Sequence, residues 1–118
     1  MATYEDITID QGTDVSMRLE LVDKNNLAKD LTNYAVAAKI KKTYNSIDSD
    51  EIVTFSAQIP TPATDGIVNL SLTNSQTDAM KIGRWVYDCE ISYTDSDGDT
   101  IVERIIEGKA TVTPSVTK

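Results

Sequence analysis

Apolar and polar residues alternate along most of this chain, and that spacing restricts the fold more than any other feature. Successive side chains of a β-strand point to opposite faces of the sheet, so strict alternation predicts a half-buried strand. The segment from Val15 to Leu21, for example, is apolar at every odd position and polar at every even one. The same spacing predicts strands at residues 7–9, 15–21, 34–40, 53–59, 68–72, 85–93, 101–106 and 110–113.

Residues that favour turns separate these segments, chiefly at positions 10–14, 23–26, 60–66 and 95–99. Short strands at such regular spacing are typical of a sandwich or a barrel. No long helical pattern lies between the strands, which argues against a parallel α/β sheet. We therefore predict an all-β fold, an immunoglobulin-like antiparallel β-sandwich of about seven to eight strands. It should form a single domain over residues 1–118.

One short helix is expected near residues 74–81. Thr73 and Gln76 have the spacing of a capping box, in which each side chain satisfies a backbone N–H at the start of the helix. Gly83 suits the left-handed residue that often ends a helix. The apolar residues in between could cover one end of the core: Ala79, Met80 and Ile82.

Composition removes most functions that depend on chemistry. The chain has no histidine and one cysteine, so the Ser–His and Cys–His nucleophile pairs, an internal disulfide and a cysteine zinc site are all unavailable. Its 19 acidic and 11 basic residues give a net charge of −8, which opposes binding to nucleic acid or anionic lipid. We expect no enzyme activity, no catalytic or metal-binding residues, no cofactor, and no nucleic-acid or membrane partner. The first residues resemble no secretory signal, so we expect synthesis in a cytoplasm.

Two acidic segments could hold a cation. Asp95, Asp97 and Asp99 place three carboxylates within five residues, and calcium prefers such oxygen ligands. Turn propensity alone also explains this segment as a hairpin tip, which is the reading we favour. The second segment, residues 48–51, could join the first if the two loops met. We favour a solvated loop there.

Three other groups have a functional and a structural interpretation. Cys89 could be a reactive thiol or a small buried residue, and we favour burial because nothing nearby would lower its pKa. The aromatic residues of the same strand could stack on sugars or nucleobases, but period two places them on one inward face: Trp85, Tyr87 and Tyr93. The basic group Lys39, Lys41 and Lys42 could contact an acidic partner, although such lysines more often protect a sheet edge.

The order of several short segments is familiar: residues 7–14, 30–34, 66–73, 83–88 and 107–112. Together they cover nearly the whole chain, which resembles the small immunoglobulin-like domains of tailed phages and is similar to the N-terminal domain of phage baseplate upper proteins. The resemblance implies a structural or adaptor module of a phage virion, made in the host cytoplasm. It would bind other tail or baseplate proteins and could form a homo-oligomer. It carries no catalytic residues with it.

Members of that family have long C-terminal extensions toward receptor-binding proteins, whereas this sequence ends at Lys118. We therefore expect an assembly module and not a receptor-binding one. Strand exchange is expected at residues 5–10 and 110–116, because an added strand gains main-chain hydrogen bonds at once. The alternatives are a carbohydrate-binding or a calcium-dependent adhesion sandwich.

Overall fold

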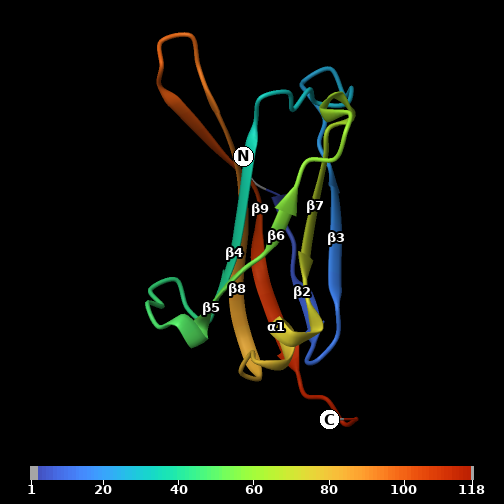
Figure 1. The fold of residues 1–118 in the computed structure, drawn as a ribbon, viewed down its shortest axis with the longest axis vertical. Coiled ribbons are helices and arrows are strands. Elements are labelled where there is room, and N and C mark those ends of the chain that lie inside the picture. Colours follow the sequence, from blue (N-terminus) through green and yellow to red (C-terminus); the bar gives the residue numbers. More distant parts are fainter. Residues whose placement is uncertain (1–2, 118) are drawn as a thin grey trace.

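Two β-sheets pack face to face in the computed structural model, which describes residues 3–117 (Figure 1). The larger sheet contains β1 (Thr3–Tyr4), β2 (Ile7–Asp10), β4 (Ala35–Lys41), β5 (Ile52–Thr54), β8 (Gly83–Thr94) and β9 (Thr100–Thr113). The smaller sheet contains β3 (Val15–Glu20), β6 (Ser56–Gln58) and β7 (Ile67–Leu72). The helix α1 (Asn74–Asp78) and two 3-10 turns, η1 (Ser49–Glu51) and η2 (Ala63–Asp65), lie in the connections.

The strand order confirms the predicted all-β sandwich. The larger sheet runs β1-β9-β8-β4-β5, with β2 also paired to β9, and the smaller sheet runs β3-β7-β6. All pairings are antiparallel except those of β1 and β2, which lie parallel to β9. The described residues form nine strands, against an expected seven to eight.

The alternating apolar side chains face the space between the sheets, as predicted. On β8, Trp85, Tyr87, Cys89 and Ile91 are all buried. Buried side chains of β4 and β9 lie beside them in the same sheet, and those of β7 face them from the smaller sheet, with partly buried residues of β3 packed against this cluster. Each fully buried apolar side chain of this size stabilises the fold by roughly 1.5–3 kcal/mol relative to exposure. This interior sets the fold and leaves the outer sheet faces, the edges and the loops free to bind a partner.

One predicted strand, residues 53–59, is two strands. Val53 pairs with Ile40 in the larger sheet, whereas Ala57 pairs with Leu70 in the smaller one. The chain crosses between the sheets at Phe55, whose N–H donates to the carbonyl of Ala38 at 3.0 Å. The alternation continues through the crossing because the two sheets share one interior. Val53, Phe55 and Ala57 all point into it.

Two other predicted strands, residues 101–106 and 110–113, are one strand. β9 runs through both and pairs with β8 along its length, with a register shift between Cys89 and Glu90. Gly108 interrupts the alternation because the backbone of Glu5 lies directly against it, where a Cβ atom would collide with the Glu5 carbonyl oxygen. The glycine is needed for the amino-terminal segment to lie on β9.

The predicted helix and its capping box are confirmed, but the helix is shorter than expected. The Thr73 hydroxyl accepts the N–H of Gln76, and the Gln76 side chain accepts the N–H of Thr73. The helix ends at Asp78, so Gly83 does not cap it, and Gly83 instead begins β8. Met80 is buried as expected, whereas Ile82 is exposed. No helix within residues 3–117 is long and apolar enough to cross a membrane.

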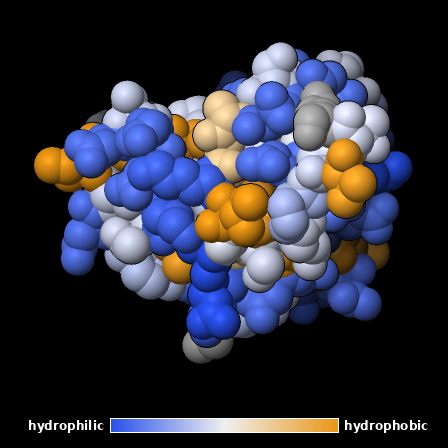
Figure 2. Space-filling model, turned by 90° about the horizontal axis from the view of Figure 1, so that it is seen from below, coloured by the Kyte–Doolittle hydropathy of each residue, from blue (hydrophilic) through white to orange (hydrophobic). Residues whose placement is uncertain are grey.

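A hydroxyl group anchors α1 to the turn between β2 and β3. Thr77 is fully buried, and its hydroxyl accepts the N–H of Gly12 at 3.1 Å and donates to the carbonyl of Thr13 at 2.7 Å. Gln11 also donates to the carbonyl of Met80. These contacts close the end of the sandwich, where hydrophobic residues appear as separate spots on a mainly hydrophilic surface (Figure 2).

Candidate protein-interaction surface

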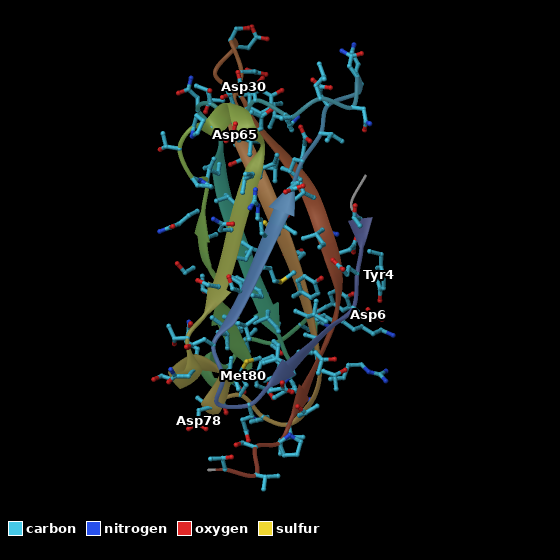
Figure 3. All side chains as sticks on the ribbon, turned by 90° about the vertical axis from the view of Figure 1, so that its right-hand side faces the viewer. Tyr4, Asp6, Asp30, Asp65, Asp78 and Met80 are labelled. Carbon is cyan, nitrogen blue, oxygen red and sulfur yellow. The ribbon has the colours of Figure 1, made fainter. Side chains whose placement is uncertain are left out.

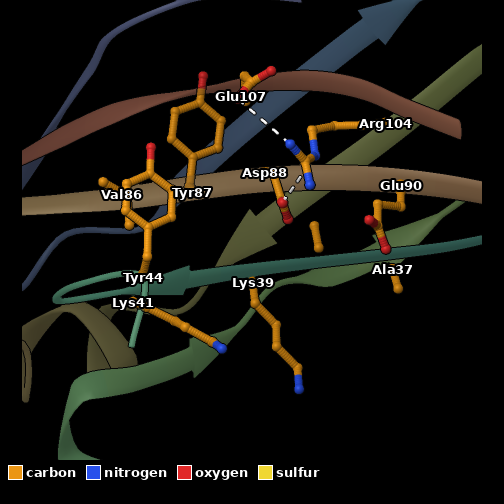
Figure 4. A pocket seen from close by; sticks show the side chains of 11 residues that line it. Ala37, Lys39, Lys41, Tyr44, Val86, Tyr87, Asp88, Glu90, Arg104 and Glu107 are labelled. Atoms are coloured by element: carbon orange, nitrogen blue, oxygen red, sulfur yellow. Dashed lines mark ion pairs between the residues drawn. The ribbon is translucent and has the colours of Figure 1, made fainter. Parts of the chain in front are cut away.

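The outer face of the larger sheet carries a hollow of about 430 Å³ (Figure 4). Most of the residues that line it point away from the core and come from β4, β8 and β9, and Tyr44 lies in the loop after β4. The residues that line the hollow include Ala37, Lys39, Lys41, Tyr44, Asp88, Glu90, Arg104 and Glu107. Ala37 leaves the centre low because its side chain is a single methyl group.

The two sides of the hollow differ in charge. On the β9 side, Arg104 lies 3.3 Å from the carboxylate of Asp88 and 3.7 Å from that of Glu107. On the β4 side, Lys39 and Lys41 have no ion-pair partner among residues 3–117. Glu90 of β8, which also lines the hollow, has none within the same residues. The arrangement can therefore bind polar groups of both signs. It contains no nucleophile paired with a base.

Tyr44 lines the hollow, and the exposed Tyr4 is its neighbour. Tyr44, in the loop after β4, is 76% exposed, and Tyr4 of β1 is also exposed. The pKa of Tyr4 is raised by partial loss of hydration first, and then by Asp6 and the neighbouring Tyr44. Ile47 follows in the same loop as Tyr44 and is 88% exposed. Aromatic residues and arginine are enriched at protein-binding surfaces.

The two acidic segments do not form a joint cation site, because they lie at opposite ends of the molecule (Figure 1). The hairpin prediction for residues 95–99 is confirmed: Asp95 accepts the N–H groups of Asp97 and Asp99 on its carboxylate at 3.0 and 2.9 Å. In the other segment, Asp50 and Glu51 each lie 3.3 Å from Lys81. Hydrogen bonds from the Lys81 ammonium group to the carboxylates of Glu51 and Asp50 raise the pKa of Lys81. Within residues 3–117 no group of three potential ligands could hold a metal ion.

The buried positions of Cys89, Trp85 and Tyr87 confirm the structural interpretation of each. Burial first, and then Asp88 and Glu90, raises the pKa of Cys89 to about 12, so the thiol stays protonated. Trp85 is 0% exposed and donates its indole N–H to the carbonyl of Lys81 at 2.8 Å. A sugar platform on these rings is excluded.

Tyr87 and Tyr93 complete the aromatic stripe. Tyr87 donates its hydroxyl to the carbonyl of Glu5 at 2.6 Å. Burial, followed by Glu5 and Asp6, raises the pKa of Tyr87 to about 12. Tyr93 is half-buried against Tyr34, with ring centroids 5.0 Å apart. All three aromatic residues of the stripe thus pack against other parts of the chain.

The lysines of β4 do not protect an edge strand, so that prediction is wrong. At Lys39 and Lys41 the strand β5 lies outside β4, and β5 is the edge. Lys42 donates its ammonium group to the carbonyl of Arg84 at 3.0 Å and lies 5.9 Å from the centre of the Trp85 ring. Lys39 and Lys41 instead line the hollow.

Sequence reasoning missed the opposite side of the hollow. Asp88, Arg104 and Glu107 come from two strands and meet only through the pairing of β8 with β9. Their spacing along the chain carries no signal for this meeting. The only sign of a hollow in the sequence is that two outward-facing residues of β4, Ala35 and Ala37, have small side chains.

No protein-family model and no curated protein matches the chain. Among solved structures, murine CRIg is similar over 92% of each chain, with 18% identity and a TM-score of 0.53. AggA, the major subunit of aggregative adherence fimbriae type I from Escherichia coli, has 10% identity over 92% of this chain and 89% of its own, with a TM-score of 0.43. The second likeness does not establish a shared fold. The first shows the fold alone.

The strand order and this likeness define an immunoglobulin-like β-sandwich. Neither solved structure is a phage tail or baseplate domain. The resemblance to phage domains therefore remains a prediction from the sequence.

Proposed function

We propose that this chain is a non-enzymatic structural or adaptor module of a phage virion, in the tail or baseplate, that acts by protein–protein assembly. The observation that carries the proposal is the hollow on the outer face of the larger sheet. It combines unpaired charges of both signs with an exposed aromatic rim.

The chemistry of the hollow favours a protein partner. Lys39 and Lys41 can pair with carboxylates, while Glu90 can pair with a basic side chain. Tyr44 offers exposed apolar area in the hollow, and Ile47 offers more in the same loop; burial of such area against a partner is favourable. A partner that presents charges of both signs beside an apolar patch would match this pattern. In this proposal the partner is another tail or baseplate protein.

The location can be tested on particles. We expect mass spectrometry of purified phage particles from the strain that encodes the chain to detect it in a fixed ratio to tail proteins. Particles that contain the known tail proteins but lack this chain would contradict the virion assignment.

The surface can be tested with matched variants. Lys39→Glu should weaken capture of the tail partner by the intact chain, because it reverses a charge inside the hollow. Lys24→Glu makes the same change of net charge in an exposed loop outside the hollow and should leave capture unchanged. Equal capture by both variants would show that the hollow is not the binding surface.

A further inference from the structure

One strand of the smaller sheet has an open edge. β3 pairs with β7 alone, and none of the other described strands lies on its second edge. β3 has six residues, whereas the other outermost strands, β1, β2, β5 and β6, have two to four each. The segments expected to exchange, near residues 5–10 and 110–116, instead pair with one another as β2 and β9. β3 is therefore the longest strand available to another chain.

The inward face of β3 is incompletely covered. Val15, Met17 and Leu19 are only half-buried, although they pack against the core. The residues of β7 that lie opposite them are fully or almost fully buried: Val68, Leu70 and Leu72. Figure 3 faces this side of the molecule, with β3 in front and the segment that carries Tyr4 and Asp6 to its right.

A second hollow, of about 330 Å³, lies where the end of β3 stands away from β9. Glu20 and Leu21 line one wall, and Glu103 and Ile105 line the other. The open edge therefore has space beside it as well as uncovered apolar surface.

The backbone of β3 presents free hydrogen-bonding groups at this edge. The N–H of Leu21 donates to the carbonyl of Gly66 at 2.8 Å, which continues the β3–β7 pairing. In an antiparallel pair, alternate residues bond to the partner strand and those between them point away. The N–H and C=O groups of Ser16, Arg18 and Glu20 therefore point to the open edge.

We propose that a second copy of this chain binds here, by antiparallel pairing of β3 with β3 about a two-fold axis at Leu19. This inference deepens the proposed assembly function and rests on it, because it names the first partner of the module. The two smaller sheets would join into one continuous sheet. Met17, Leu19 and Leu21 of each copy would cover one another.

The charges of β3 select this register. With Leu19 on the axis, Arg18 of each copy lies opposite Glu20 of the other, and opposite charges directly across a sheet attract. Both are on the exposed face of the strand, 3.4 Å apart within one copy. An axis at Arg18 places two arginines opposite each other, and an axis at Glu20 places two glutamates opposite each other. An axis at Met17 places Asp14 opposite Glu20 twice.

The test is the association constant of the intact chain, measured by sedimentation equilibrium. Arg18→Glu and Glu20→Arg each create two like-charged pairs across the interface. Each should weaken dimerisation at least about tenfold, equivalent to about 1.4 kcal/mol. The double variant R18E/E20R exchanges the charges, restores both opposite pairs and should dimerise like the wild type. Asp97→Arg, at the tip of the β8–β9 hairpin, changes net charge as Glu20→Arg does and should not weaken the dimer.

Two further readouts locate the contact. Amide hydrogen exchange at Arg18 and Glu20 should slow as the concentration rises into the dimer range. Leu19→Cys should form a disulfide-linked dimer on mild oxidation, and Met17→Cys should not. Folded variants can be confirmed by circular dichroism, so loss of structure is not mistaken for loss of pairing.

A wild-type chain that stays monomeric at millimolar concentration would overturn this inference, as would a double variant that fails to recover. Efficient crosslinking through Met17→Cys in place of Leu19→Cys would overturn the register. A monomer that is nevertheless found in phage particles would leave the proposed assembly function standing, so the two failures can be told apart.

Discussion

Replacement of Gly108 by alanine should detach the amino-terminal segment from β9. The backbone of Glu5 lies so close to Gly108 that an added methyl group would collide with the Glu5 carbonyl oxygen. The same carbonyl accepts the hydroxyl of Tyr87 at 2.6 Å, and the N–H of Glu5 donates to Glu107 at 2.9 Å. A shift of Glu5 that relieves the collision therefore breaks these hydrogen bonds.

The expected loss combines two effects. Over-packing a tight contact costs about 1–3 kcal/mol. The loss of a buried hydrogen bond costs about 0.5–1.5 kcal/mol. Together they predict a fall of about 2–4 kcal/mol in the free energy of unfolding, a large part of the roughly 5–15 kcal/mol of an ordinary domain.

Urea unfolding followed by circular dichroism measures this change, and a fall of this size should lower the midpoint by about 1–2 M if the slope is near 2 kcal/mol per M. Gly98→Ala is the matched control, since Gly98 has a positive φ of 85° but nothing within 4 Å of a new Cβ atom. It should cost only about 1 kcal/mol, from backbone strain alone.

A double-variant cycle tests the mechanism. Tyr87→Phe should destabilise the wild type but have little further effect in the Gly108→Ala background, because the bond to Glu5 is already lost there. A Gly108→Ala chain as stable as the Gly98→Ala control, or effects of Tyr87→Phe that are equal in both backgrounds, would refute the reasoning.

Three further predictions concern the rest of the chain. Thr77→Val should lower the free energy of unfolding by about 1–3 kcal/mol, because the N–H of Gly12 and the carbonyl of Thr13 lose their buried partner, and urea unfolding would show it. The pKa values of Cys89 and Tyr87 are raised to about 12 from 9.0 and 10.0, chiefly by burial, so the stability that they contribute is fully present below pH 9. That stability should fall between pH 9 and 12, and less steeply above pH 10 in Tyr87→Phe; an unchanged midpoint up to pH 12 would argue against these burials. Thermal unfolding should be the same in millimolar calcium and in chelator, since the Asp95 carboxylate already accepts two backbone N–H groups, and a higher midpoint with calcium would revive the adhesion alternative.

Much of the fold could be predicted because alternation reports directly on which side chains face inward. The stripe from Trp85 to Ile91 and the capping box at Thr73 are where the sequence places them. Alternation does not report which sheet receives a strand, so the crossing at Phe55 was invisible. The interruption at Gly108 looked like a strand end because the close approach of Glu5 is a contact between residues far apart in the sequence.

The candidate surfaces could not be predicted, because both depend on strand order. The sequence predicts Lys39 at a sheet edge, but β5 lies outside β4 at that position. Arg104 gains its ion-pair partners only through the pairing of β9 with β8. The open edge of β3 is likewise a consequence of the amino-terminal strands joining β9 and not β3. The local sequence does not indicate which strand the amino-terminal strands pair with.

Fluorescence of Trp85 tests most directly whether the two sheets enclose one dry interior, since Trp85 is the single tryptophan and is a fully buried member of the inward-facing stripe on β8. The folded chain should show blue-shifted emission that acrylamide quenches far less than it quenches the chain in urea. Emission and quenching that match those of the unfolded chain would mean that the ring faces water and that the two sheets do not enclose a dry interior.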